Sequence, residues 1–300
     1  MLTVSQFTMM HILGGTSAGR VAATLAQELH QPLLPATFKR FPDSEFYVRL
    51  LDSVAGEEVV IVQTAYPDEK IVELFLMQDA VHDAGAKKIT VVLPYFGYSR
   101  QDKKFEEGEA ISARAIAEHI SMRADSVITV DPHKEHILRF FTVPAFSCSA
   151  VTQLARYLKG KRVDFVLAPD KGAKDRAKEA AAFIHCEYDY LEKTRIDGTT
   201  TIITPKTLDA HGKRVAIIDD IISTGGTMAN SIKELKKQGA KEVYVACTHG
   251  LFIGQAKEKL LNAGCDDIIS TDTIENEFSK VSVAKCVAEA FQKTLPQLKN

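Results

Sequence analysis

Two adjacent carboxylates precede a glycine-rich turn in the second half of the sequence. The apolar run 215–218 leads into Asp219 and Asp220. The turn that follows is small and hydroxylated, and it consists of Ser223, Thr224, Gly225, Gly226 and Thr227. Backbone N–H groups at a helix start suit a phosphate, but two acids beside it would be repulsive unless they bound hydroxyl groups or Mg²⁺. The segment therefore predicts a sugar phosphate site, in preference to a plain helix start capped by Thr227.

Two further segments of this half carry charge at positions that could serve chemistry. Segment 168–173 ends a buried strand and precedes a helix, so it offers backbone donors for a diphosphate and the Asp170 carboxylate for Mg²⁺. A simple helix-start turn is the alternative. Lys193 and Arg195 stand two residues apart on an extended segment, so their side chains point the same way. Taken alone, such a doublet is more typical of a solvated charge pair.

The first half of the chain contains two segments that combine aromatic and charged side chains. A purine could stack on the aromatic rings, and an arginine could hold phosphates as a planar donor fork. A hairpin edge with solvated charges and a loop that covers the end of a sheet are the alternatives. The candidate residues are Phe41, Asp43 and Glu45 in one segment, and Arg100, Gln101 and Asp102 in the other.

Two histidines follow the apolar run 127–130. His133 and His136 are three positions apart, so both imidazoles could share one face of a turn. A metal site is one interpretation. A polar turn with two exposed imidazoles is the other, and this segment alone favours it.

The elements that must position these residues are repeated along the chain. Run 59–62, a helical pattern over 71–84 and the turn Gly85-Ala86-Lys87 make a strand, a helix and a strand. Run 215–218, a helical pattern over 228–238 and Gly239-Ala240-Lys241 repeat that order about half a chain later. Alternating strands and helices predict parallel sheets with right-handed crossovers. Ligands of such sheets bind beyond the carboxyl ends of the strands, which is where the candidate residues lie.

We therefore predict two similar α/β domains, each with a mainly parallel sheet flanked by helices. The expected boundaries are 1–148 and 149–300, and the final helix, 281–291, is a candidate to return to the first domain. A length of 300 residues agrees with about two domains.

The motifs together carry a resemblance to a known family. Segment 215–227 resembles the phosphoribosyl diphosphate (PRPP) motif of type I phosphoribosyltransferases and of ribose-phosphate diphosphokinases, the PRPP synthetases. Segments 41–45 and 95–102 resemble the nucleotide-site segments of the synthetases alone. The sequence is thus identified as a member of that family, similar to its shorter, archaeal-type members. Ser44 replaces the usual glycine, so we expect the turn to adopt positive φ less freely, and Pro132 replaces the usual leucine before the histidine.

The resemblance implies both a fold and an activity. It implies two phosphoribosyltransferase-like domains and an enzyme that transfers the diphosphoryl group of ATP to the anomeric hydroxyl of ribose 5-phosphate, giving PRPP and AMP with Mg²⁺ as cofactor. A single-domain phosphoribosyltransferase and a non-catalytic regulatory paralogue are the rivals. The duplicated half and the two nucleotide-type loops disfavour the first. The retained site residues disfavour the second.

The resemblance also assigns roles to the candidate residues. Phe41, Asp43 and Glu45 would face ATP bound mainly by a neighbouring subunit, so at least a dimer is expected. The ATP-binding residues of that subunit would be Arg100, Gln101, Asp102 and His133, with His133 and Asp170 on the metal side. The catalytic loop would carry Lys193 and Arg195. The ribose 5-phosphate site would consist of Asp219, Asp220, Ser223, Thr224, Gly225, Gly226 and Thr227. No role follows for His136.

Composition narrows the setting in which the protein works. Lys and Arg number 37 and Asp and Glu 39, so a net charge of -2 offers no global field for nucleic acid or an anionic membrane, and neither is expected as a partner. The five cysteines are odd in number and form no C-x-x-C pair, which favours a reducing cytoplasm. We expect neither a signal peptide nor a membrane span.

Overall fold

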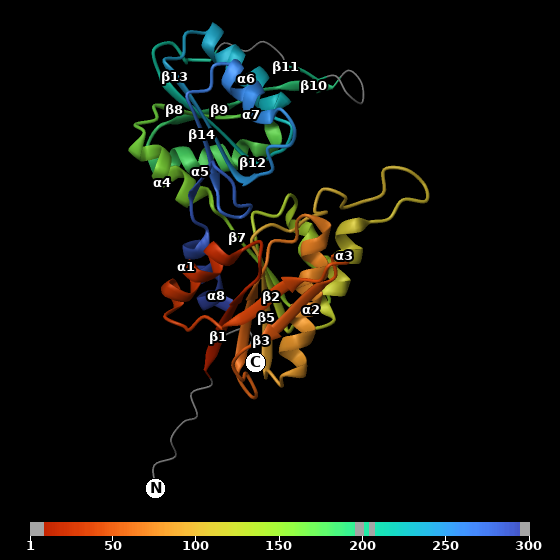
Figure 1. Cartoon of the computed structure of the whole chain (residues 1–300). Helices are drawn as coiled ribbons and strands as arrows, with labels where there is room; N and C mark the ends of the chain where they lie inside the picture. Colours follow the sequence, from red (N-terminus) through yellow and green to blue (C-terminus); the bar gives the residue numbers. More distant parts are fainter. Residues whose placement is uncertain (1–8, 196–200, 204–207, 295–300) are drawn as a thin grey trace. The chain divides into compact units, whose positions relative to one another are not determined.

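The computed structural model describes residues 9–195, 201–203 and 208–294, with the backbone alone for 193–195 and 201–203 (Figure 1). Their contacts form two compact units. The first unit comprises the residues up to Cys148 together with those from Val283 onward, and the second unit comprises Ser149–Ser282.

The first unit is built on a parallel sheet of five strands. Their order across the sheet is β1-β4-β5-β6-β7, and every neighbouring pair is parallel. The strands are β1 (Met10–Gly14), β4 (Glu58–Val62), β5 (Lys88–Leu93), β6 (Ser126–Val130) and β7 (Ala145–Cys148). The interior strands are nearly continuous apolar runs, as expected for strands that are buried on both faces.

Helices cover both faces of this sheet. One pair, α1 (Gly19–Leu29) and α8 (Ala284–Thr294), packs side by side on one face, and α2 (Asp68–Asp83) and α3 (Ser112–Ser121) lie on the other (Figure 1). The short helix η1 (Glu135–Phe140) follows β6. An antiparallel hairpin of β2 (Ala36–Arg40) and β3 (Phe46–Leu50) packs on α2 through β3.

The second unit has a parallel sheet of six strands in the order β15-β14-β13-β12-β8-β9. The strands are β8 (Phe165–Ala168), β9 (Glu187–Tyr190), β12 (Arg214–Ile222), β13 (Glu242–Gly250), β14 (Asp267–Thr271) and β15 (Ser279–Val281). The helices are α4 (Val151–Gly160), η2 (Lys171–Ala173), α5 (Lys174–Ile184), α6 (Gly226–Lys237) and α7 (Ala256–Asn262). A small antiparallel pair, β10 (Lys193–Arg195) and β11 (Thr201–Ile203), completes the described elements.

Each face of the second sheet has its own core. Val215 and Ile217 of β12 point into a cluster with α6 and α7, whereas Ala216 and Ile218 point into a cluster with α4 and α5. This is the alternation that a strand requires. The expected fold class, two parallel sheets flanked by helices, is confirmed.

The internal repeat is visible in the elements. Gly85 and Gly239 follow α2 and α6 with φ values of 81° and 82°, a backbone conformation that glycine adopts without a steric penalty. In the first unit α8 packs on α1, as α4 packs on α5 in the second. The predicted helix 71–84 begins earlier, at Asp68, because Pro67 precedes it and acidic residues occupy its first turn.

Candidate active site

Asp219 and Asp220 lie near the carboxyl end of β12 and leave the strand on opposite faces. Asp220 shares the face of Ile218, toward α5, and Asp219 shares that of Ile217 and is in register with Cys247 of β13. Each carboxylate also accepts a hydrogen bond from the next backbone N–H, at 2.9 Å from Asp220 N to Asp219 Oδ1 and 2.9 Å from Ile221 N to Asp220 Oδ1. These backbone hydrogen bonds hold the two carboxylates in orientation.

Asp219 lies in an environment that disfavours its charged form. Burial raises the pKa of Asp219 well above its usual value, and the negative charges of Asp220 and Asp170 raise this pKa further. Burial and the charge of Asp219 likewise raise the pKa of the neighbouring Cys247 thiol. Three carboxylates crowded at one sheet edge favour a cation or a set of hydroxyl donors there.

The glycine-rich turn begins α6 with no capping side chain among the described residues. Gly225 is the N-cap, at a φ of 74°, so the interpretation of Thr227 as the cap is wrong and Thr227 lies in the first helical turn. A side chain at Gly225 would be strained at this φ, and its Cβ would lie 3.3 Å from the Ala256 carbonyl oxygen. The predicted start of this helix at 228 is correspondingly two residues late.

The carbonyl groups of the turn are held on one side. The backbone N–H of Ile253 donates to the Ser223 oxygen at 2.9 Å, and Lys259 Nζ donates to the Thr224 oxygen at 3.5 Å. In a trans peptide the N–H points opposite to the carbonyl, so the N–H groups of Thr224 and Gly225 are directed away from these partners. With the start of the α6 dipole, they form a set of donors suited to an anion.

Asp170 organises the neighbouring turn between β8 and α5. Its Oδ1 accepts hydrogen bonds from the N–H groups of Gly172, at 2.9 Å, and Ala173, at 3.2 Å. The carboxylate therefore acts as the cap of η2, which is the helix-start role that the sequence left open. The metal-side role expected for Asp170 stays a prediction.

Lys193 and Arg195 belong to β10. The backbone is extended and pairs antiparallel with β11, in the register Lys193 to Ile203 and Arg195 to Thr201. The two side chains lie outside the described residues, as does the rest of the expected catalytic loop, 196–200. Their catalytic role stays a prediction.

Phe41, Asp43 and Glu45 form the tip of the β2–β3 hairpin. The N–H of Phe41 donates to the backbone carbonyl oxygen of Glu45 at 2.9 Å, and Asp43 Oδ1 accepts from the N–H of Glu45 at 3.1 Å. Ser44 adopts a φ of 74°, so the expected reluctance at this position did not prevent a left-handed turn. The Phe41 ring is 42% exposed, with Lys39 Nζ 5.0 Å from its centroid.

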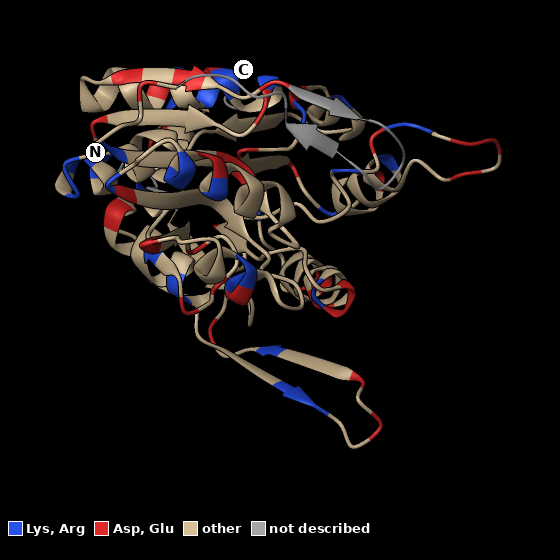
Figure 2. Cartoon of the chain, turned by 90° about the horizontal axis from the view of Figure 1, so that it is seen from above, with Lys and Arg blue, Asp and Glu red and all other residues tan. Residues whose placement is uncertain are grey.

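The hairpin projects from its unit, with basic residues coloured along its strands and acidic ones at its turn (Figure 2). Its exposed aromatic tip is available to a partner molecule. This agrees with the hairpin alternative for the local structure and leaves the expected ATP contact of a neighbouring subunit as a prediction.

Arg100, Gln101 and Asp102 lie in the loop after β5, which Gly97 holds against the preceding strand-end loop. A Cβ at Gly97 would lie 2.1 Å from the Ala65 carbonyl oxygen, so only glycine fits. Arg100 is exposed. Gln101 Nε2 donates to Glu109 Oε2 at 3.3 Å.

Glu109 is a residue that the sequence did not single out as functional. Its Oε2 also accepts the N–H groups of Phe105 and Glu106, at 2.7 and 3.1 Å, and these bonds lower its pKa. The Glu109 carboxylate thus holds three residues of the loop by hydrogen bonds. In the sequence, Glu109 is distinguished only as an acid near the end of the polar loop that precedes α3.

His136 makes a contact that links two of the predicted loops. Its Nε2 lies 3.2 Å from Asp102 Oδ2, with Asp102 13% and His136 49% exposed. His133, three residues earlier, is half-buried beyond the end of β6. The histidine turn and the loop of Arg100 to Asp102 are therefore joined within the first unit.

A metal cage is not what the described residues build. Among them, no three His, Cys, Asp or Glu side chains converge on one metal-sized point. Mg²⁺ needs no such cage, since it usually keeps several waters and binds one or two carboxylates plus substrate phosphates. His133 belongs to the first unit and Asp170 to the second, so their expected joint metal site stays a prediction.

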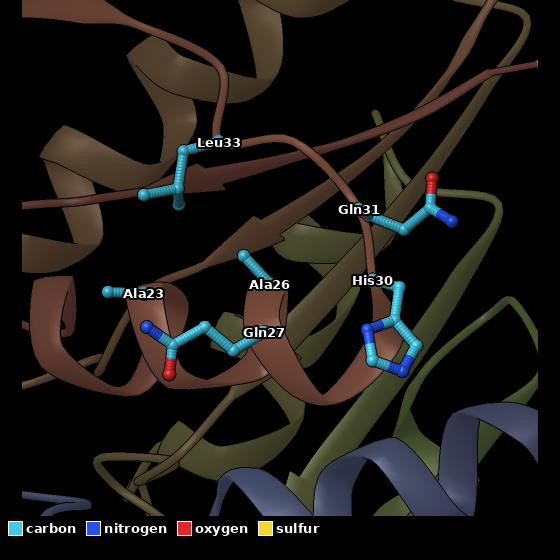
Figure 3. A pocket seen from close by; sticks show the side chains of 6 residues that line it. All are labelled: Ala23, Ala26, Gln27, His30, Gln31 and Leu33. Carbon is cyan, nitrogen blue, oxygen red and sulfur yellow. The ribbon is translucent and has the colours of Figure 1, made fainter.

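A shallow hollow of about 380 Å³ lies on the first unit, away from these residues (Figure 3). Its lining comes from α1 and the connection that follows, and consists of Ala23, Ala26, Gln27, His30, Gln31 and Leu33. Since α1 runs back from the carboxyl end of β1, this hollow lies toward the opposite edge of the sheet. It brings together no acid or Lys/Arg side chain, so it is not the candidate site.

Two observations concern the cysteines and the expected lack of a membrane span. All five cysteines are free thiols. Of the helices that the structure describes, none is both long and apolar enough to cross a bilayer.

Comparisons with known proteins agree over nearly the full length of the chain. Residues 10–123 match the N-terminal domain of ribose phosphate pyrophosphokinase, and residues 149–284 match the phosphoribosyl transferase domain. The ribose-phosphate pyrophosphokinase of Methanopyrus kandleri is 42% identical over 288 residues, covering 94% of this chain and 99% of that protein. The one from Sulfolobus acidocaldarius is 40% identical over 280 residues, covering 91% and 96%.

A solved structure shows the same architecture. The phosphoribosylpyrophosphate synthetase from Mycobacterium smegmatis superposes with a TM-score of 0.83 at 29% identity, covering 97% of this chain and 100% of that one. The expected resemblance to archaeal synthetases and the expected two-domain architecture are therefore confirmed.

Proposed function

The chain belongs to the ribose-phosphate pyrophosphokinase family and makes PRPP from ATP and ribose 5-phosphate, and we propose that the carboxyl edge of the second unit's sheet holds the ribose 5-phosphate for this reaction. One observation carries the proposal. Asp219 and Asp220 lie near the end of β12, and the turn that follows has its carbonyl groups held on one side and starts α6 at a glycine N-cap.

The hydroxyls and the phosphate of ribose 5-phosphate each find a matching group at this edge. Asp219 and Asp220 accept hydrogen bonds from the ribose 2- and 3-hydroxyls, directly or through Mg²⁺. The N–H groups and hydroxyls of Ser223, Thr224, Gly225, Gly226 and Thr227 bind the 5-phosphate. The anomeric hydroxyl is thereby fixed as the nucleophile, and positioning of this kind supplies much of the rate of a phosphoryl-type transfer.

The reaction needs no covalent intermediate on the protein. The anomeric oxygen attacks the β-phosphorus of ATP, the bond from that phosphorus to an AMP oxygen breaks, and the hydroxyl proton passes to solvent. Lys193 and Arg195 neutralise the charge that develops on the transferred diphosphoryl group and on AMP. This role is the one that the family resemblance implies for the two residues.

The family generally uses Mg²⁺, and the donors of this chain fit that ion. Asp170 is a carboxylate whose charge acts on Asp219. Carboxylate oxygens and water are the ligands that Mg²⁺ prefers. We assign Asp170 and His133 to the metal side of the nucleotide. When bound, Mg²⁺ would neutralise phosphate oxygens of ATP.

We assign the nucleotide to the first unit. Arg100 holds phosphates, and Gln101 and Asp102 contact the adenine, with His136 keeping Asp102 in place. Phe41, Asp43 and Glu45 reach the ATP of a second copy of the chain, since they lie at the tip of a projecting hairpin (Figure 2). The enzyme is then at least a dimer. A cytoplasmic location stays a prediction.

Replacing Asp220 by Asn tests the ribose assignment. The variant keeps the shape of the side chain and removes its charge, so we expect the KM for ribose 5-phosphate to rise about tenfold or more while the KM for ATP stays within about twofold. The measurement is PRPP and AMP formation by phosphorus NMR. Asp175→Asn, an exposed acid on α5, is the matched control. A normal KM for ribose 5-phosphate in the Asp220 variant would overturn the assignment.

A further inference from the structure

An arginine that no motif identifies faces the ribose acids. Arg176 is the third residue of α5, the helix that follows the Asp170 turn. A cation in the first turn of a helix is unfavourable against the helix dipole, and a nearby anion offsets this. Lys174 shares the first turn with Arg176 and Asp175, so the sequence alone does not single out Arg176.

The compensating anion is Asp220. Arg176 Nη2 lies 3.7 Å from Asp220 Oδ2, and the two side chains are only 19% and 12% exposed. The strand alternation explains the pairing, because Asp220 leaves β12 on the face that α5 covers. The distance is that of an ion pair and exceeds that of a direct hydrogen bond.

The pair fixes the Asp220 carboxylate at both of its oxygens. Oδ1 accepts the N–H of Ile221 at 2.9 Å, and Oδ2 faces the guanidinium. Asp219 lies on the opposite face, where burial and then the charge of Asp220 raise its pKa.

We propose that Arg176 is a positioning residue for ribose 5-phosphate, which holds Asp220 as the charged, oriented acceptor of a ribose hydroxyl. The inference rests on the ribose role assigned to Asp220 above. Arg176 also ties the helix that starts at the diphosphate turn to the strand that carries the ribose acids. It acts through Asp220 and needs no contact with the substrate.

Substitution of Arg176 tests the role of its charge. In Arg176→Met we expect the KM for ribose 5-phosphate to rise about tenfold, as for the loss of one partly buried charged contact, with kcat and the KM for ATP within about threefold. Arg176→Lys keeps the charge and should restore the KM to within about threefold of the parent value. Lys178→Met removes an exposed charge from the same helix and is the matched control.

A double variant separates positioning from direct contact. If Arg176 acts through Asp220, adding Arg176→Met to Asp220→Asn should leave the KM for ribose 5-phosphate at the value of Asp220→Asn alone. Additive rises would overturn the inference, since they would mean that Arg176 binds the substrate itself. An unchanged KM in Arg176→Met, or equal loss in the Lys and Met variants, would overturn it as well.

Folding and the underlying assignment are controlled separately. Thermal unfolding of each variant identifies a loss that comes from instability, and Arg176→Lys then carries the test alone. A normal KM in Asp220→Asn alone would defeat the ribose assignment, whereas a raised KM there with a normal Arg176→Met would defeat only the role of Arg176.

Discussion

The two units share an architecture and differ where their strands end. In the second unit β12 runs into Asp219 and Asp220, and α6 starts at a glycine. At the equivalent end of β4 the first unit has Gln63 and Thr64, both uncharged and buried, and α2 starts with Asp68 and Glu69 in its first turn. Acids at a helix start repel a phosphate. One copy of the repeat thus offers an anion site, and the other excludes it.

The end of β1 in the first unit corresponds to the end of β8 in the second, and a buried carboxylate binds there. After β1, the N–H and hydroxyl of Thr16 donate to Glu73 of α2 at 2.6 and 2.7 Å, and Lys70 Nζ lies 3.2 Å from the same carboxylate. Glu73 is fully buried. The Glu73 carboxylate thus occupies the turn before α1. The corresponding turn of the second unit is the Asp170 turn before α5, which lies beside the ribose acids.

The duplication has preserved the sheet more than the site. Apolar strand interiors are interchangeable as long as they fill the core. Strand-end residues need only satisfy their polar groups, so they can change to internal hydrogen bonding in one copy while the other keeps its chemistry.

The sharpest test of this division is Lys193→Ala. If the chemistry depends on the second unit, we expect kcat to fall by about two orders of magnitude or more, because a charge that stabilises the transferred group is lost. The KM for ribose 5-phosphate should change little. Initial rates of AMP formation measure both. Lys178→Ala serves as the control, and an unchanged kcat in Lys193→Ala would remove this residue from the mechanism.

Removing the internal anion tests the other side of the comparison. Glu73→Ala leaves Lys70 and Thr16 without this carboxylate, so we expect the free energy of unfolding to fall by about 3 kcal/mol. Denaturant unfolding measures it. Glu69→Ala, on an exposed face of the same helix, should change stability by less than about 0.5 kcal/mol. Equal effects of the two substitutions would mean that the buried contact contributes nothing.

The smallest effect is expected for Asp219→Asn, which gives the end of β12 an uncharged side chain like those at the end of β4. Asp219 has a raised pKa in the folded state, so between its usual value and that raised value the native protein binds more protons than the unfolded chain. Stability therefore falls as pH rises through this window and stays lower above it. Asp219→Asn should remove the loss, raising the free energy of unfolding at neutral pH by about 1 kcal/mol and flattening its pH dependence.

Unfolding at several pH values measures this change, and the gain should accompany weaker ribose 5-phosphate binding. Asp209→Asn, an exposed acid of the same unit, is the control. A variant less stable than the parent at neutral pH would show that Asp219 is favourably paired when charged.

Much of this molecule could be predicted from sequence because its signals are local. The apolar runs 59–62 and 215–218 identify interior strands, and the Gly-Ala-Lys turns reveal the repeat. Asp219 and Asp220 were found since two acids before a glycine-rich turn are chemically conspicuous. Helix starts were less accurate, as at α6, because a glycine at a φ of 74° supplies the cap that side-chain preferences would assign to Thr227.

Local patterns in the sequence are enough to identify the strands, their repeat, the family and the strand ends at which the chemistry lies. The folded structure is needed to show which side chains from separate elements meet: His136 with Asp102, Glu73 with Thr16, and Arg176 with Asp220. The physical reason is that each of these contacts joins residues from different elements. Strand order and the facing of each side chain bring them together, and no local pattern along the chain encodes that.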